Sequence, residues 1–280
     1  MFPAGRPGFV QVGLPGPHQR RCHRGKVRRS ADARKIRPVT VEVEGALVMP
    51  FSSIRRRIAQ HMVQSVATSP HVSMGIEVDF AKIAAMRSQL QHDWRAREGF
   101  ALSYLPFVAW AVCRAIADYP LVNASVDGET LIVSAEVGLG FAVDLDFQGL
   151  VVPVIPSADQ LTIAELARRI HRLSEAARTR HLSPDDVGGG SYTISNIGSA
   201  GTLFTTPIIN QPQVAILSVD GIRRKPVVDP EADDQIAIHP VGVLVQSFDH
   251  RAFDGAYSAA FLGQLRHILE ETAWETIVSE

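Results

Sequence analysis

The stretch VGVLVQSFDHRAFDGA, residues 241–256, runs from an apolar half into a histidine with charged neighbours and a glycine. The apolar half is typical of a buried strand. Asp254 and Gly255 open the closing helical pattern, and Asp254 stands where a helix N-cap is expected. His250 lies four residues before Asp254. Two interpretations follow: a buried structural histidine at a strand end, or a proton-transfer residue.

Working outward, apolar periodicity predicts an α/β chain in which long helices alternate with strands. Helices are expected over 51–65, 80–97, 105–119, 162–179 and 254–272, and strands over 71–79, 188–198, 213–222 and 236–250. Residues 121–155 are expected to form a strand meander. Ser52 or Ser53 is expected to cap the first helix. Strands mixed with long helices indicate an α+β two-layer sandwich, with a mixed sheet packed against helices.

Composition divides the chain into a tail, residues 1–42, and one domain, residues 43–280, that is long enough for an enzyme's catalytic domain. Residues 1–38 hold ten Lys and Arg against a single acid, Asp32, although the whole chain carries a formal charge of -1. The tail is rich in Gly, Pro and Arg, which predicts disorder. A solvated tail, a basic arm that binds nucleic acid or an acidic partner, and an organellar transit peptide are all compatible with this composition.

Other features exclude several classes of function. Cys22 and Cys113 form no disulfide or metal framework, so no metal site is expected. The longest apolar stretch, YLPFVAWAVC, is too short to span a bilayer. A cytoplasmic protein without nucleic-acid or membrane partners is therefore expected. GLG at 138–140 lacks the third glycine of a dinucleotide site, GGG at 188–190 lacks the lysine of a phosphate loop, and Ser195 lacks a nucleophile elbow.

Six motifs occur in order between residue 49 and about residue 272: MPFSSIRRRIAQHM, SPHVSMGIEVD, GLGFAVDLDFQGLVVPVI, YTISNIGS, TTPIINQPQVAILSV and DHRAFDGA. Together they closely resemble the catalytic domain of dihydrolipoamide acyltransferases, the E2 components of 2-oxo acid dehydrogenase complexes. The resemblance implies a chloramphenicol acetyltransferase-like fold. It also implies a homotrimer with active sites at subunit interfaces, which assembles further into a higher-order cage in some relatives.

The resemblance assigns roles that suit acyl transfer between the thiols of coenzyme A and dihydrolipoamide. His250 takes the thiol proton, because an imidazole titrates near neutral pH. Ser195, from the neighbouring subunit, donates a hydrogen bond to the thioester oxyanion. Asp254 orders the turn that carries His250. Arg87 matches an arginine that contacts the nucleotide phosphates of coenzyme A, with a plain surface arginine as the alternative. Trp110 replaces the family's usual lysine, so it either stacks on adenine or simply packs.

The lipoyl group is expected in trans from a lipoyl domain of another chain. None of the four lysines, Lys26, Lys35, Lys82 and Lys225, has the context of a lipoylated hairpin. Residues 1–48 are too few for a lipoyl fold, and no domain for binding the E1 and E3 components is seen. The resemblance favours acetyl or branched-chain acyl groups over succinyl.

Two alternatives to the acyltransferase remain. One is a catalytically dispensable scaffold subunit that only assembles the complex core. The other is a condensation-type enzyme of peptide synthesis, which resembles the chain remotely through a His-His-x-x-x-Asp-Gly motif. Asp249 stands at the first histidine of that motif, and the chain is short for its two-lobed fold. Retention of Ser195, His250 and Asp254 favours the acyltransferase.

Overall fold

The computed structural model describes residues 41–43, 46–229 and 233–277. The chain divides into two units, Met1–Pro50 and Phe51–Glu280. In the first unit, β1 (Val41–Val43) pairs antiparallel with β2 (Ala46–Val48). Residues 1–40 of the predicted tail lie outside the described residues, so the tail stays a prediction. All that follows concerns the second unit.

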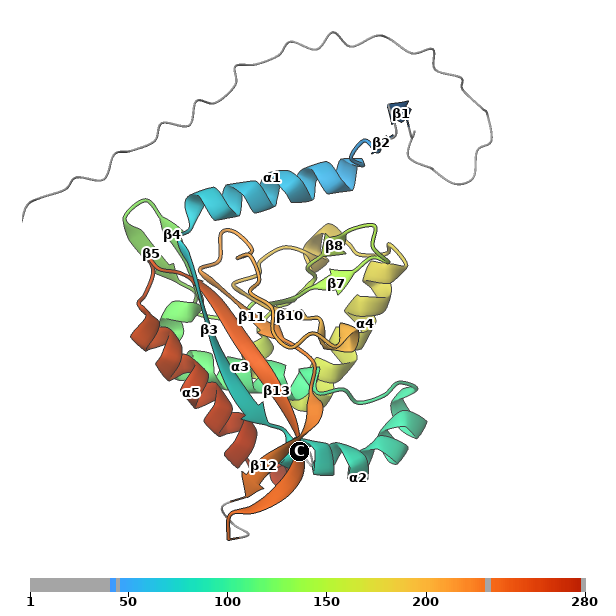
Figure 1. The fold of residues 1–280 in the computed structure, drawn as a ribbon, viewed down its shortest axis with the longest axis vertical. Coiled ribbons are helices and arrows are strands. Elements are labelled where there is room, and N and C mark those ends of the chain that lie inside the picture. Colours follow the sequence, from blue (N-terminus) through green and yellow to red (C-terminus); the bar gives the residue numbers. More distant parts are fainter. Residues whose placement is uncertain (1–40, 44–45, 230–232, 278–280) are drawn as a thin grey trace, which may run out of the picture. The chain divides into compact units, whose positions relative to one another are not determined.

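A seven-stranded mixed sheet forms the centre of the second unit (Figure 1). Its strand order is β12-β13-β11-β10-β6-β9, and β3 pairs with β13 beside this path. The neighbours of β10 are parallel, whereas β13 runs antiparallel to β3, β11 and β12. The strands are β3 (His71–Asp79), β6 (Leu139–Phe141), β9 (Val154–Ile155), β10 (Tyr192–Asn196), β11 (Ala215–Val219), β12 (Arg223–Asp229) and β13 (Gln235–Asp249).

The predicted meander over 121–155 is wrong in its pairing. Its strands are divided among the central sheet and two small antiparallel pairs, β4 (Ala124–Asp127) with β5 (Thr130–Val133) and β7 (Val143–Asp144) with β8 (Leu150–Val151). Within this region β6 and β9 pair with each other, but β6 pairs in parallel with the distant β10. A parallel partner cannot be joined by a tight turn, so sequence neighbours do not reveal it.

The helices match the predicted segments closely. They are α1 (Ser53–Thr68), α2 (Ala81–Glu98), α3 (Leu105–Asp118), α4 (Ile163–Arg178), α5 (Gly255–Glu271) and the short α6 (Trp274–Ile277), which the sequence did not predict. Ser52 caps α1 by accepting a hydrogen bond from the Arg55 backbone at 3.1 Å. The capping box of α4 joins Thr162 and Glu165. None of the helices in the described part of the chain is long and apolar enough to cross a bilayer.

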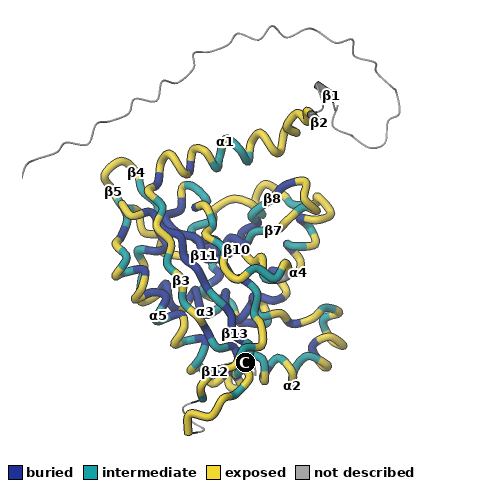
Figure 2. Tube along the Cα trace, in the orientation of Figure 1, coloured by how far each residue is buried: buried dark blue, intermediate teal, exposed yellow. Residues whose placement is uncertain are grey.

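The two faces of the central sheet differ, because side chains alternate along each strand. One face belongs to the main core, where Tyr192, Leu217 and Phe248 are buried together with Phe261 of α5. Helix α3 packs against both α4 and α5 behind this face. The opposite face carries small polar side chains, including Thr193, Ser195, Ser218 and Ser247. Figure 2 shows the strands as the buried centre, while α1 is exposed along most of its length.

The glycines at 138 and 140 are needed for close packing of the backbone. A Cβ atom on Gly138 would lie 2.0 Å from the carbonyl oxygen of Gly189. A Cβ atom on Gly140 would lie 2.8 Å from Val152 and 3.0 Å from Thr193. Glycine is therefore required where β6 meets the entry to β10. The thiol of Cys113 in α3 is buried in the core, and burial raises its pKa to about 12.

Substituting Gly138 tests this close approach. We expect Gly138→Ala to lower the free energy of unfolding by at least ~2 kcal/mol, because the backbone of Gly189 has to move away. Gly263→Ala in α5 is the matched control: no atom lies within 4 Å of its Cβ position. The control should be neutral or stabilising by up to ~1 kcal/mol. Equal denaturant midpoints for both variants would contradict the argument.

Candidate active site

The end of β13 positions His250. Strand β13 pairs with β3 on one side and with β11 on the other. The pairing with β3 continues to the end of the strand, where Asp249 lies opposite His71. The His250 backbone N–H then donates to the carbonyl of Pro70 at 3.0 Å. The imidazole stacks on Phe248 with a centroid distance of 5.8 Å and leaves 45% of the side chain exposed. A buried structural histidine is therefore excluded, and the ring is accessible to a substrate.

Asp254 occupies the predicted N-cap position of α5, but the expected side-chain cap is wrong. Its backbone carbonyl accepts from Tyr257 and Ser258, whereas its carboxylate makes no capping hydrogen bond. The carboxylate is 85% exposed and lies 3.8 Å from Nδ1 of His250. That distance exceeds a hydrogen bond, so Asp254 faces the histidine as a solvated charge.

Asp249, which the sequence indicated only as a departure from the condensation motif, holds the turn through Arg251. Its buried carboxylate accepts from the Arg251 backbone at 2.9 Å and from the Arg251 guanidinium at 2.6 and 3.0 Å. Burial alone would raise the pKa of Asp249, but hydrogen bonds from Arg251 and Ser69 bring it below its ordinary value. The residues on both sides of His250 are thus clamped together. The only sequence signal was an acid at the end of a buried strand.

A second set of buried contacts spans the same turn. Gln246 of β13 accepts a hydrogen bond from the Ser258 hydroxyl of α5 at 2.6 Å. Its amide donates to the Tyr192 hydroxyl of β10 at 3.1 Å. All three side chains are fully buried, so each polar group needs its partner. Burial also raises the pKa of Tyr192, which keeps its hydroxyl neutral. These contacts fix the start of α5 relative to the strand that ends at His250.

Ser195 lies at the opposite end of the sheet from His250. In the register, Ser195 pairs with Ser218, and Ser218 pairs with Val245. His250 follows Val245 by five residues, which corresponds to roughly 17 Å at ~3.3 Å per residue. Proton transfer and oxyanion binding require contacts of about 3 Å at one substrate. The structure therefore does not bring Ser195 and His250 together within one chain.

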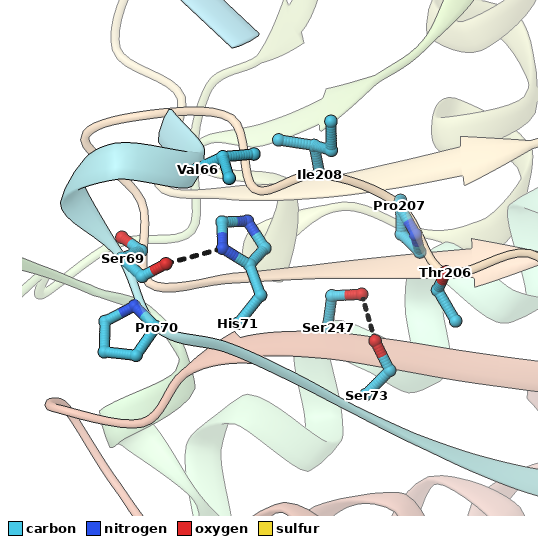
Figure 3. A pocket seen from close by; sticks show the side chains of 9 residues that line it. All are labelled: Val66, Ser69, Pro70, His71, Ser73, Thr206, Pro207, Ile208 and Ser247. Atoms are coloured by element: carbon cyan, nitrogen blue, oxygen red, sulfur yellow. Dashed lines mark hydrogen bonds between the residues drawn. The ribbon is translucent and has the colours of Figure 1, made fainter. Parts of the chain in front are cut away.

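A cavity of about 380 Å³ lies between the α1–β3 junction, β13 and the loop before β11 (Figure 3). It adjoins the His250 turn through Pro70, whose carbonyl accepts the His250 N–H. Its lining residues are Val66, Ser69, Pro70, His71, Ser73, Thr206, Pro207, Ile208 and Ser247. The Ser73 and Ser247 hydroxyls lie 2.8 Å apart. His71 donates from Nδ1 to the Ser69 carbonyl, because its Nε2 accepts the Ile209 backbone N–H at 3.0 Å. His71 is thus a neutral structural histidine, and the cavity has no cationic or anionic lining residue.

The residues expected near the nucleotide of coenzyme A, Arg87 and Trp110, both contact other residues of their own chain. The Nε of Arg87 donates to the carbonyl of Leu102 at 2.9 Å, and its guanidinium lies 3.9 Å from the centroid of the Tyr104 ring. Arg87 is therefore already held by its own chain, and a role toward coenzyme A stays a prediction. Trp110 packs edge-on against Trp274 of α6 at 5.7 Å. The described residues contain no cluster of His, Cys, Asp or Glu suited to a metal ion.

Comparison with known proteins identifies the family. The model for the 2-oxoacid dehydrogenases acyltransferase (catalytic domain) matches residues 44–277. The chain belongs to this family. It is 41% identical over 229 residues to the dihydrolipoyllysine-residue acetyltransferase component of the pyruvate dehydrogenase complex of Mycobacterium bovis. That match covers 80% of this chain and 41% of the relative. The chain spans about half or less of this relative and of the corresponding Bacillus subtilis component.

Solved acyltransferase cores share the fold. The dihydrolipoamide acetyltransferase of Azotobacter vinelandii is 32% identical with a TM-score of 0.76, covering 82% of this chain and 92% of that one. That structure was used to investigate a serine, a histidine and an asparagine in the catalytic mechanism. The cubic core of a pyruvate dehydrogenase multienzyme complex is 33% identical with a TM-score of 0.75, covering 82% and 92%. The predicted family and α/β architecture are thereby confirmed. Similar acyltransferases include acetyl, succinyl and branched-chain types.

The clamp around His250 can be tested through stability. We expect Arg251→Met to lower the free energy of unfolding by about 1–3 kcal/mol at pH 7, because it leaves the buried Asp249 carboxylate underpaired. The pKa of Asp249 is depressed in the folded chain. Its ionised form therefore stabilises the fold above the unfolded pKa of about 4, and this contribution is lost as pH falls through the lower folded value.

The deficit of Arg251→Met should consequently be complete at pH 7 and smaller at about pH 3 in urea unfolding. Arg266→Met is the matched control, because Arg266 pairs with Glu270 at 3.9 Å on the surface of α5. Its deficit should stay below ~0.5 kcal/mol at both pH values. A deficit for Arg251→Met that does not depend on pH would contradict the clamp.

Proposed function

We propose that this chain is the acyl-transferring core of a 2-oxo acid dehydrogenase complex, moving an acyl group between dihydrolipoamide and coenzyme A. The observation that carries the proposal is the accessible His250 at the end of a strand held on both edges, in a chain of this family. The lipoyl group would come from a lipoyl domain outside the described residues. Lys82 and Lys225, the two described lysines, are engaged in ion pairs with Glu271 and Glu77.

Two copies of the chain complete one site in this proposal. Ser195 and His250 stand at opposite ends of the sheet, so His250 acts with Ser195 of the partner subunit. A homotrimer provides such contacts in a closed ring. The likeness to a cubic multienzyme core supports assembly of trimers into a cage. The Azotobacter relative supports the residue choice, because its histidine and asparagine are four positions apart, as His250 and Asp254 are here.

The chemistry is a transfer between two thiols. The Nε2 atom of His250 takes the proton of the attacking thiol, since an imidazole with pKa near 6.5 accepts it close to neutral pH. The thiolate attacks the thioester carbonyl carbon, and the resulting oxyanion accepts a hydrogen bond from Ser195 of the partner subunit. Collapse of the tetrahedral intermediate expels the second thiolate. The imidazolium returns the proton to that thiolate, so the enzyme ends unchanged.

We also propose acetyl or branched-chain acyl groups as the cargo, rather than succinyl. The cavity beside the His250 turn supports this choice, because its lining is apolar or hydroxylic and its histidine is held neutral. A succinyl group carries a carboxylate, which would lose water there without gaining a counterion. Arg87 would contact the nucleotide of coenzyme A if its remaining guanidinium nitrogens face the substrate.

The proposed roles of His250 and Ser195 can be tested by enzyme kinetics. In an assay of free dihydrolipoamide with acetyl-, isobutyryl- and succinyl-coenzyme A, His250→Ala should lower kcat by ~10²–10⁴-fold. Ser195→Ala should lower kcat by ~10²–10³-fold with KM nearly unchanged, because it removes one oxyanion donor. The exposed His267→Ala serves as the control and should match wild type. Transfer by His250→Ala within about tenfold of wild type would refute the proposed role.

A further inference from the structure

The end of β13 opposite to His250 forms a two-stranded ribbon. The ribbon consists of β12 and residues 235–240 of β13, which pair antiparallel with each other. Strand β3 pairs with β13 only from Val241 onward, so the ribbon extends beyond it. The ribbon projects at the lower end of Figure 1, and Figure 2 shows it largely exposed. Because a two-stranded ribbon is only marginally stable in water, a partner that covers one of its faces stabilises it.

One face of the ribbon is held by its own chain. Residues that lie opposite each other in an antiparallel pair share a face, and Lys225 lies opposite His239. Lys225 pairs with Glu77 of β3, and Nδ1 of His239 lies 2.5 Å from the carboxylate of Asp79. This face is therefore charged and already in contact with the central sheet.

The other face of the ribbon is apolar and uncovered. Pro226 lies opposite Ile238, and Val228 lies opposite Ile236. We call these four residues the apolar face. Val228, Ile236 and Ile238 are 63%, 77% and 59% exposed, and Pro226 is exposed as well. Contiguous exposed apolar side chains are typical of interaction surfaces.

The edges of the ribbon are unsuited to an added strand. Pro226 in β12 and Pro240 in β13 lack the N–H group that a further strand would need as a donor. The carbonyl of Pro240 already accepts the Phe80 N–H at 2.8 Å. A partner is therefore expected on the apolar face rather than along an edge.

The charges at the two ends of the apolar face indicate which partner fits. Arg224 shares this face at its base, opposite Pro240, whereas the exposed Asp233 and Asp234 precede β13 at the other end. Within the described part of the chain, the ion pairs include none of these three charged residues. The five residue steps from Arg224 to Asp229 span roughly 17 Å. A second ribbon laid antiparallel on the first by a twofold axis brings each Arg224 to the acidic pair of the other copy.

We propose that the apolar face docks onto the apolar face of a second copy of this chain, in an antiparallel twofold arrangement. Burial of the apolar side chains supplies most of the attraction, and the exposed ion pairs at the ends set its direction. The contact is separate from the candidate active site, because Ile236 and Asp249 are 13 residues apart on β13, roughly 43 Å along the strand. The inference thus goes beyond the proposed function and leaves His250 and Ser195 accessible.

Charge introduced on the apolar face tests the docking. The variants are Ile236→Glu and Ile238→Glu in the full chain. Phe147→Glu is the control, because Phe147 is 96% exposed in the turn between β7 and β8. Sedimentation velocity over a dilution series should show a dissociation constant between copies that is at least tenfold higher for the two ribbon variants than for wild type and control. Circular dichroism checks that each variant is folded.

A charge swap tests the antiparallel arrangement. Arg224→Glu alone, and Asp233→Lys with Asp234→Lys, should each weaken the association, because like charges then meet at both ends. The triple variant should associate more tightly than either, since the swapped charges attract again. Acyl transfer per chain should equal that of wild type in all of these variants.

Three results would overturn the inference. One is a wild type that stays monomeric, or ribbon variants that associate as tightly as wild type. Another is a triple variant that associates no better than Arg224→Glu, which would mean another orientation or another partner. The third is loss of acyl transfer together with association, which would place the contact at the shared site. An assembled wild type without acyl transfer would refute the proposed function and leave the ribbon contact standing.

Discussion

The pairing of β13 along both of its edges is the constraint on which the site depends. Between Val241 and Asp249 the strand is bonded to β3, and over much of that length it is also bonded to β11. A shift of register by one residue would turn Phe248 out of the core and Ser247 into it. The ladder therefore fixes where His250 emerges. Through β11 and β10 it also fixes Ser195 at the far end, so the distance between them cannot be closed within one chain.

Each end of the sheet is secured by a buried carboxylate. At the histidine end, Asp249 is paired with Arg251 and holds the backbone around His250. At the serine end, Asp220 accepts three hydroxyl groups and holds the loop beside Ser195. A buried charge is costly unless its hydrogen bonds are complete, so neither residue tolerates loss of its partners. The fold therefore holds His250 and Ser195 firmly at the two ends of the sheet. The proposed reaction combines the histidine end of one copy with the serine end of another.

Local patterns in the sequence predicted the elements well but not their partners. β3 and α2 through α5 fell within a few residues of their expected ranges, because periodicity is a local property. β12 was missed because Arg223, Arg224, Lys225 and Pro226 show no alternation of apolar residues. Asp254 stands at the predicted N-cap, but its side chain makes no capping hydrogen bond. The clamp at Asp249 was overlooked, because burial of a charged side chain depends on tertiary contacts. The separation of Ser195 and His250 required the register of three strands.

The central claim is that one site takes His250 from one copy and Ser195 from another. Subunits carrying His250→Ala and subunits carrying Ser195→Ala should each be inactive alone. Co-refolding them gives mixed oligomers in which some contacts join an intact His250 to an intact Ser195. The shared-site account predicts recovery of a fraction of wild-type acyl transfer as the mixing ratio approaches one to one. Mixed oligomers that are verified by mass spectrometry and remain inactive at every ratio would contradict it.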